Sequence, residues 1–362
     1  MRRVLGLLLF VCGLLGSSAS PGGVPRFTAS PIAWANLDAQ LERAGDTAAA
    51  DGGWLLRLRL RANDAAFRRV ARLAAGDVGS ADGYLRRARH RATLHQFALA
   101  LDDLDRASRS GASLADVAAA RAMVLVANGH AREVLISLRT QADARPDLAS
   151  ATALAHACVA AGMPQQADYW YRRALRALDT VLPFAWAELQ FARGVLWSEH
   201  LGDPARGARR YRAALAALPE FVGARIHLAQ IEQARGRPIP AMALLEAIGA
   251  DAGDPEAPAL RADLRRTLGL SGVDGDLAAA RERFIELTAH YPLAYADHAA
   301  RFYLGSGRDP QRAWAWAQLN LANRPTAVAR SLAAAAARAT GRPFAAAPPR
   351  VPSRAERAAC AP

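Results

Sequence analysis

Apolar and small residues recur along most of this chain with the three- and four-residue spacing of amphipathic helices. In the segment Ala167–Leu175, the small or bulky residues Ala167, Tyr171 and Ala174 share one helical face. Similar stretches, separated by short turns, run from residue 32 to residue 340, and no strand pattern is apparent. The pattern therefore predicts an all-α protein.

One order of glycine, small residue, bulky residue and proline recurs through residues 81–326. Its starting glycines are Gly129, Gly162, Gly202, Gly236, Gly275 and, with one inserted residue, Gly307. Gly129 and Gly162 are 33 residues apart, and Gly202 and Gly236 are 34 apart. Glycine accepts the positive φ of a helix end, and a small residue five positions later lets two antiparallel helices approach closely. Each unit is thus expected to be a helix–turn–helix.

This arrangement resembles the tetratricopeptide repeat, whose unit is 34 residues of paired antiparallel helices. The segments Ala167–Leu175 and Gly207–Pro219 resemble the second helix of that family most closely. The resemblance implies a right-handed superhelical solenoid of about seven units over residues 81–326, with a concave groove that binds peptides or partner domains. Stretched loops near 179–186 and 249–275 leave the unit boundaries open.

The flanks of the repeat differ from it in composition. Residues 20–31 are rich in Pro, Gly and Ser and are predicted to form a linker. Residues 32–80 are predicted to be helical, either as degenerate repeats or as a cap, and 327–340 to be a capping helix. The Ala-, Pro- and Arg-rich tail 341–362 is predicted to be disordered.

The first 19 residues have the features of a signal peptide. Arg2 and Arg3 precede the apolar stretch Val4–Leu15, and cleavage is expected after Ala19, with Ser18 as the alternative. An uncleaved anchor and lipidation of Cys12 are further alternatives. No other stretch has the length and apolarity of a transmembrane helix. We therefore expect a periplasmic or secreted protein.

Two cysteines lie outside the signal peptide. Cys158 is in a predicted helix and Cys360 is in the predicted disordered tail. An oxidising compartment would permit them to pair, but their sequence context favours two free or separately buried thiols.

The formal net charge is +13, and all 46 basic residues are arginines. The lack of lysine excludes a Walker A lysine and a Schiff-base lysine. Arginines often lie near acids, as Arg106 lies near Asp102, Asp103 and Asp105, which favours solvated helix faces. The alternative is a surface that binds an acidic polysaccharide or another polyanion; nucleic acid is not expected as the partner.

Candidate catalytic chemistry is sparse. The sequence has no Cys-x-x-Cys, no His-x-x-x-His and no strand-linked phosphate loop, and its eight histidines are dispersed among the units. We therefore expect no catalytic residue, cofactor or metal, with an unrecognised enzyme site as the third alternative.

The main hypothesis is an exported scaffold that binds a protein or peptide, with a role in assembling an envelope complex. The candidate groove residues are polar or aromatic positions of first helices: Gln190, Arg193, Trp197, Arg225, His227, Gln230, His298 and Arg301. Arginines there would suit a carboxylate or an acidic segment, because the guanidinium donates two parallel hydrogen bonds.

Overall fold

The computed structural model describes residues 27–45, 50–345 and 351–362, and all regular elements in these ranges are helices. The predicted signal peptide and its cleavage site lie outside the described residues. In the described part, α1 (Ser30–Ala44), α2 (Asp51–Arg61) and α3 (Asp64–Ala75) precede the repeat. The all-α prediction is thus confirmed.

Seven antiparallel pairs follow. They are α4 (Ala81–Thr93) with α5 (Phe97–Arg109), α6 (Leu114–Ala127) with α7 (Ala131–Ala144), α8 (Leu148–Ala160) with α9 (Pro164–Arg176), α10 (Pro183–Val195) with α11 (Pro204–Ala217), α12 (Val222–Ala234) with α13 (Pro238–Glu246), α14 (Glu256–Leu268) with α15 (Val273–His290), and α16 (Pro292–Leu304) with α17 (Pro310–Asn323). A π-helical turn, η2 (Leu196–His200), extends α10, and α18 (Ala327–Thr340) and α19 (Arg354–Cys360) complete the chain.

The predicted turn glycines lie where the helix pairs require them in four units. Gly129, Gly162, Gly202 and Gly236 all have positive φ, between 67° and 96°. Gly275 was wrongly assigned to a turn, because α15 begins at Val273 and contains it. The preceding turn uses Gly269 and Gly272 instead, with φ of 67° and 90°.

The close helix approach that the small residues predict is also present. Ala167, Ala241 and Ala280 have no exposed surface, and Tyr211 and Phe284 are 0% and 1% exposed on the same faces of their helices. A Cβ at Gly207 would lie 2.7 Å from the Cβ of Ser198, so any larger residue would separate α11 from η2. Backbone-to-backbone proximity therefore fixes this pair.

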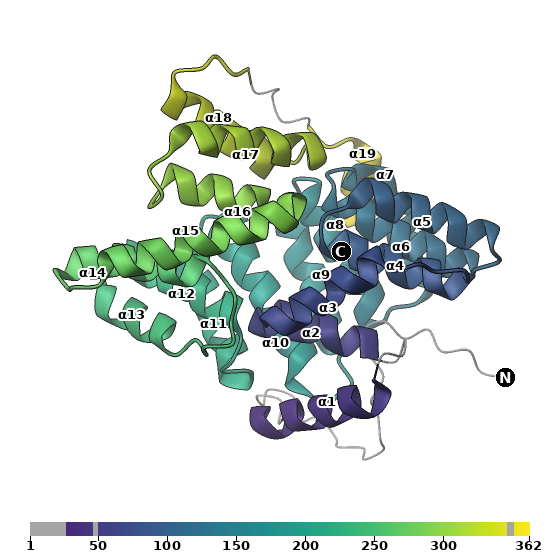
Figure 1. Ribbon diagram of the computed structural model, residues 1–362. Helices are drawn as coiled ribbons and strands as arrows, with labels where there is room; N and C mark the ends of the chain where they lie inside the picture. The colour runs from purple at the N-terminus through teal and green to yellow at the C-terminus, as the bar shows by residue number, and fades with distance from the viewer. Residues whose placement is uncertain (1–26, 46–49, 346–350) are drawn as a thin grey trace.

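The N-terminal helices lie against distant repeats. In Figure 1, α2 and α3 cross the middle of the molecule, between α4–α6 on one side and α11–α15 on the other. Leu60 on α2 is fully buried in a cluster with Phe184 and Phe221. The ring of Phe67 on α3 packs on Tyr291 and Tyr295, with centroids 4.5 and 5.5 Å apart. These helices thus form part of the hydrophobic core.

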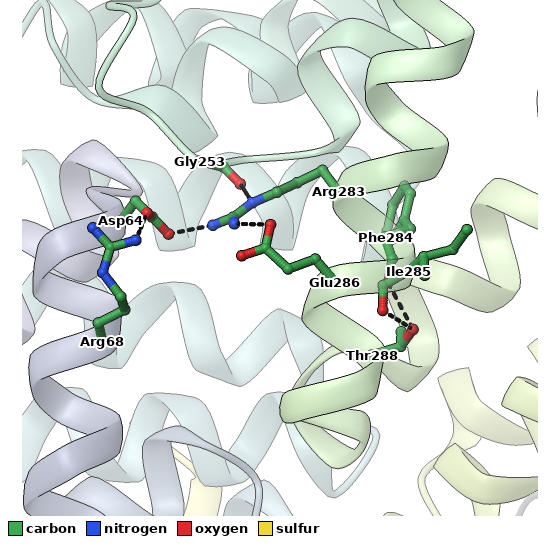
Figure 2. Close-up of polar contacts among 8 residues, drawn as sticks. All are labelled: Asp64, Arg68, Gly253, Arg283, Phe284, Ile285, Glu286 and Thr288. Carbon is green, nitrogen blue, oxygen red and sulfur yellow. Dashed lines mark hydrogen bonds and ion pairs between the residues drawn. The ribbon is translucent and has the colours of Figure 1, made fainter.

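Figure 2 shows the polar anchor of the same hairpin. Arg283 on α15 is paired with Asp64 at the start of α3, donates from Nε to the carbonyl of Gly253 at 3.1 Å, and pairs with Glu286 at 2.6 Å. Asn63 donates to Asp251 at 3.1 Å beside it. The α2–α3 hairpin is therefore held against the stretched loop after α13.

The predicted linker ends in ordered contacts. Phe27 packs on Trp186 with ring centroids 5.5 Å apart, and the amide of Thr28 donates to the carbonyl of Val181 at 2.8 Å. Helix α1 begins at Ser30, two residues inside the range predicted as linker.

The solenoid curves far enough for its late repeats to contact its early ones. Asn323 at the end of α17 donates to the carbonyl of His95 at 3.0 Å, and Arg324 donates to the carbonyl of Ala127 at 3.1 Å. The turn after α17 therefore lies against the turns that follow α4 and α6.

The prediction of a disordered tail is wrong for residues 354–360, which form α19 against α7 and α8. A capping box joins Ser353 and Glu356 at its start, and Ala359 and Cys360 are buried. Cys158 and Cys360 form a disulfide, so the expectation of separate thiols is also wrong. The composition of the tail did not indicate this helix, because only Ala359 and Cys360 form its buried apolar face.

Candidate functional site

Two of the predicted groove residues are inside the protein. Gln190 and Arg193 on α10 are 2% and 5% exposed, so neither lines an open groove. Arg193 donates from Nε to Oδ1 of Asp168 on α9 at 2.9 Å, and Trp197 donates from its indole to the same oxygen at 3.3 Å. Arg193 and Trp197 face α9 because Asp168, a residue of the preceding second helix, is buried and requires donors.

The predicted positions on α12 point in different directions. Arg225 donates to the carbonyl of Pro219 at 2.8 Å and so stabilises the turn before α12, whereas Gln230 is exposed. Because His227 lies two residues after Arg225 on a helix of 3.6 residues per turn, its side chain is rotated by about 200° around the helix axis from that of Arg225.

His227, His298 and Arg301 all lie beside carboxylates on one polar surface. Nδ1 of His227 is 3.1 Å from Oε1 of Glu199 on η2. Nδ1 of His298 is 2.7 Å from Oε1 of Glu256, the first residue of α14, and Arg301 is 3.2 Å from Asp297. We call these six residues the histidine–carboxylate surface: Glu199, His227, Glu256, Asp297, His298 and Arg301.

The charges of this surface act on one another across four elements. Burial raises the pKa of Glu256, but His298, Arg301 and His227 outweigh it and hold that pKa below its ordinary value. Glu199 likewise has a lowered pKa, because His227 and Arg301 offset its burial. The residues from η2, α12, α14 and α16 therefore form one electrostatic unit.

His298 is held as a cation. Burial lowers its pKa, but the carboxylates of Glu256 and Asp297 have the larger combined effect and raise the pKa to about 9. Asp297 has a depressed pKa, since His298 and Arg301 outweigh its burial. A histidine so paired is charged at neutral pH and donates hydrogen bonds, rather than exchanging protons as a general base would.

The surface is open to a partner. The side chains of Glu199, Arg301 and His298 are 51%, 45% and 38% exposed. Sequence reasoning did not single out Glu256 or Asp297, although Asp297 directly precedes the predicted His298 and Glu256 starts a helix after Pro255.

Many arginines are occupied by internal ion pairs. Arg87 donates to both carboxylate oxygens of Asp103 at 2.9 and 2.7 Å, and Arg91 approaches the same acid at 2.8 Å. Asp103 is fully buried, so it does not belong to the solvated face predicted for it. Part of the arginine content thus serves packing between first and second helices.

No cluster of three or more His, Cys, Asp or Glu side chains in the described residues is placed to hold a metal ion. None of the helices that they form combines the length and the apolarity needed to cross a bilayer.

The fold is an all-α solenoid of helix pairs. Comparison with known families concerns the type of helical repeat that it contains. Residues 200–264 match the family model of the tetratricopeptide repeat, the family that the residue spacing indicated. No curated protein matches the sequence.

Several solved structures are similar to this chain. One is the APC/C hetero-tetramer Cut9–Hcn1, with 15% identity, a TM-score of 0.47, and alignment over 84% of this chain and 58% of that chain. A tetratricopeptide repeat protein from Parabacteroides merdae has 15% identity and a TM-score of 0.41 over 71% of this chain and 98% of its own. Yeast Tom70 has 14% identity and a TM-score of 0.35, and the alignment covers 91% of this chain and 83% of that chain.

Proposed function

We propose that this protein is an exported scaffold that binds a segment of a partner protein on the histidine–carboxylate surface, in the assembly of an envelope complex. The observation that carries the proposal is the convergence of His227, His298 and Arg301, from two first helices, with three carboxylates on one exposed surface. Stacked helix pairs offer such extended surfaces to proteins and peptides.

The surface suits a partner segment that carries both signs of charge. Arg301 and the histidines offer donors, and Glu199 offers an acceptor that is half exposed. Paired charges of this kind set register and orientation more than raw affinity. A polyanion is a poorer fit here, because the carboxylates would repel it.

Two features support export. The N-terminal sequence has the pattern of a signal peptide. The disulfide between Cys158 and Cys360 belongs to the kind of bond that forms in oxidising compartments such as the periplasm.

The test is a reciprocal pull-down with cross-linking from the periplasmic fraction, using the full chain and two variants. Arg301→Glu reverses a charge of the proposed surface, whereas Arg338→Glu makes the same change on the exposed side of α18. We expect one partner to be captured by the wild type and by Arg338→Glu, and lost with Arg301→Glu at unchanged helix content. Equal capture by all three proteins, or no specific partner, overturns the proposal.

A further inference from the structure

The short helix α19 occupies a groove formed by the second helix α7, the first helix α8 and Trp170 on the second helix α9. It lies against α7 and α8, and Cys360 is joined to Cys158 on α8. Arg139 on α7 donates to the carbonyl of Ala361 at 2.6 Å, and Trp170 on α9 donates to the carbonyl of Cys360 at 3.0 Å. The groove therefore holds the C-terminal end of a helix by its free carbonyl groups, which have no partners within the helix.

The repeat places an equivalent groove between α11 and α13. Ten residues after the turn glycines Gly129 and Gly202 come Arg139 and Arg212. Four residues before Gly162 and Gly236 come Cys158 and Glu232, and eight residues after them come Trp170 and Leu244. The three residues that hold α19 thus have counterparts two repeats further along.

The counterparts line an open groove of about 560 Å³. Its walls include Leu215, Ala216, Leu228 and Leu244, with Glu232 between Arg212 and Arg237. Under α19, Trp170 and Ala142 are 0% and 1% exposed, whereas the equivalent Leu244 and Leu215 are only partly buried. The second groove has the exposed apolar surface that α19 covers in the first.

The charges of the open groove indicate what it would hold. The side chains of Arg212 and Arg237 are 48% and 55% exposed, and both pair with Glu232, which is 3% exposed. Two guanidiniums and one carboxylate leave one positive charge at the mouth. A helix C-terminus carries a partial negative charge and free carbonyls, so it is complementary to this mouth.

We propose that the groove between α11 and α13 binds the C-terminal turn of a short, alanine-rich helix from a partner protein, in the way that the groove between α7 and α9 binds α19. Small apolar side chains of that helix would contact Leu215, Leu228 and Leu244, and its last carbonyls would accept from Arg212 and Arg237. This inference rests on the proposed scaffold function but uses a different surface.

Disulfide trapping tests the geometry directly. The probe is a synthetic peptide with the sequence of residues 351–362, whose one thiol corresponds to Cys360. The full chain receives Glu232→Cys, which puts a thiol at the counterpart of Cys158, and is incubated with the peptide in a glutathione redox buffer. Docking raises the effective concentration of the two thiols, so we expect capture about tenfold above that of the control Arg209→Cys, an exposed position on α11.

Two further variants complete the design. Leu215→Trp, added to Glu232→Cys, puts a bulky ring where the first groove has the small Ala142; it fills the groove and should reduce capture to the level of the control. Ala216→Cys, at the exposed edge of the same groove, replaces Glu232→Cys if the latter lowers helix content. Capture no higher than with Arg209→Cys, or unaffected by Leu215→Trp, overturns the inference. The pull-down with Arg301→Glu leaves this groove unchanged, so the two proposals succeed or fail separately.

Discussion

Arg283 on α15 and Asp64 on α3 form an ion pair although 219 residues separate them in the sequence. The same guanidinium holds the carbonyl of Gly253. One side chain thus joins the N-terminal hairpin, the loop after α13 and the sixth helix pair.

Replacing Arg283 with Met should loosen this junction. Hydrogen bonds to charged groups contribute about 1.5–3 kcal/mol each when partly buried, and Arg283 is 20% exposed. We expect the free energy of unfolding to fall by about 2 kcal/mol, measured by urea denaturation, with earlier proteolytic cleavage between α2 and α4. The control Arg312→Met removes an ion pair of a side chain that is 54% exposed and should cost about 0.5 kcal/mol or less. Equal effects would contradict a special role for Arg283.

Loss of the disulfide should destabilise the molecule by about 2–4 kcal/mol, because the bond restricts a long loop of the unfolded chain. The measurement is thermal unfolding of the wild type and of Cys158→Ala/Cys360→Ala, each with and without a thiol reductant. The wild type should lose stability on reduction, and the double variant should not respond. A wild type indifferent to the reductant would show that α19 is held by its other contacts, such as Arg132 with Glu356 at 2.9 Å.

Arg193 and Arg301 should behave differently although both were predicted to lie in the groove. Removing one partner of a buried ion pair leaves the other charge uncompensated, at a cost of about 3–5 kcal/mol. Arg193→Ala should therefore destabilise the protein strongly, since Arg193 and Asp168 are buried. Arg301→Ala should cost about 1 kcal/mol or less, because the side chain is 45% exposed. Urea denaturation of the two variants side by side decides this, and similar costs would refute the assignment of Arg193 to the interior.

His298 should titrate with a pKa of about 9, detectable by the chemical shift of its ring protons in NMR. Glu256→Gln removes the main partner and should move the pKa toward its ordinary value of about 6.5. Glu246→Gln, an exposed acid on α13, should leave it unchanged. A pKa of His298 that is the same in the wild type and in Glu256→Gln would show that the 2.7 Å contact does not hold in solution.

The raised pKa of His298 also makes stability fall as the pH rises. The folded protein binds the His298 proton more tightly than the unfolded chain does, so this contribution is complete below pH 6.5. It is lost as the pH rises through about 9. Solvent screening at a side chain 38% exposed limits it to about 1 kcal/mol.

The helix pairs could be predicted because their signals are local. Gly162, Ala167 and Tyr171 lie within one turn and one helix, and spacing alone relates them. The position of the α2–α3 hairpin against α15 and the loop after α13 could not be predicted. Asp64 and Arg283 meet only through the curvature accumulated over six helix pairs. For the tail, the capping box at Ser353 and Glu356 was a legible helix signal, but Cys360 gives no indication that it lies beside Cys158.

The inward direction of the Arg193 side chain could not be predicted, for a related reason. Its direction depends on Asp168, which sits on the preceding helix and looks like any surface acid in the sequence. His298, by contrast, was identified as a groove residue, and its acidic neighbours were found only in the structure.

The bond between Cys158 and Cys360 also imposes an order on biosynthesis. The two cysteines are 202 residues apart, so during synthesis the first thiol must wait until the four helix pairs from α10 to α17 have followed it. In that interval Cys158 is open to other thiols, including those of oxidoreductases and of neighbouring chains. Cys158 is therefore buried under α19 only in chains whose last helix has been synthesised and has docked.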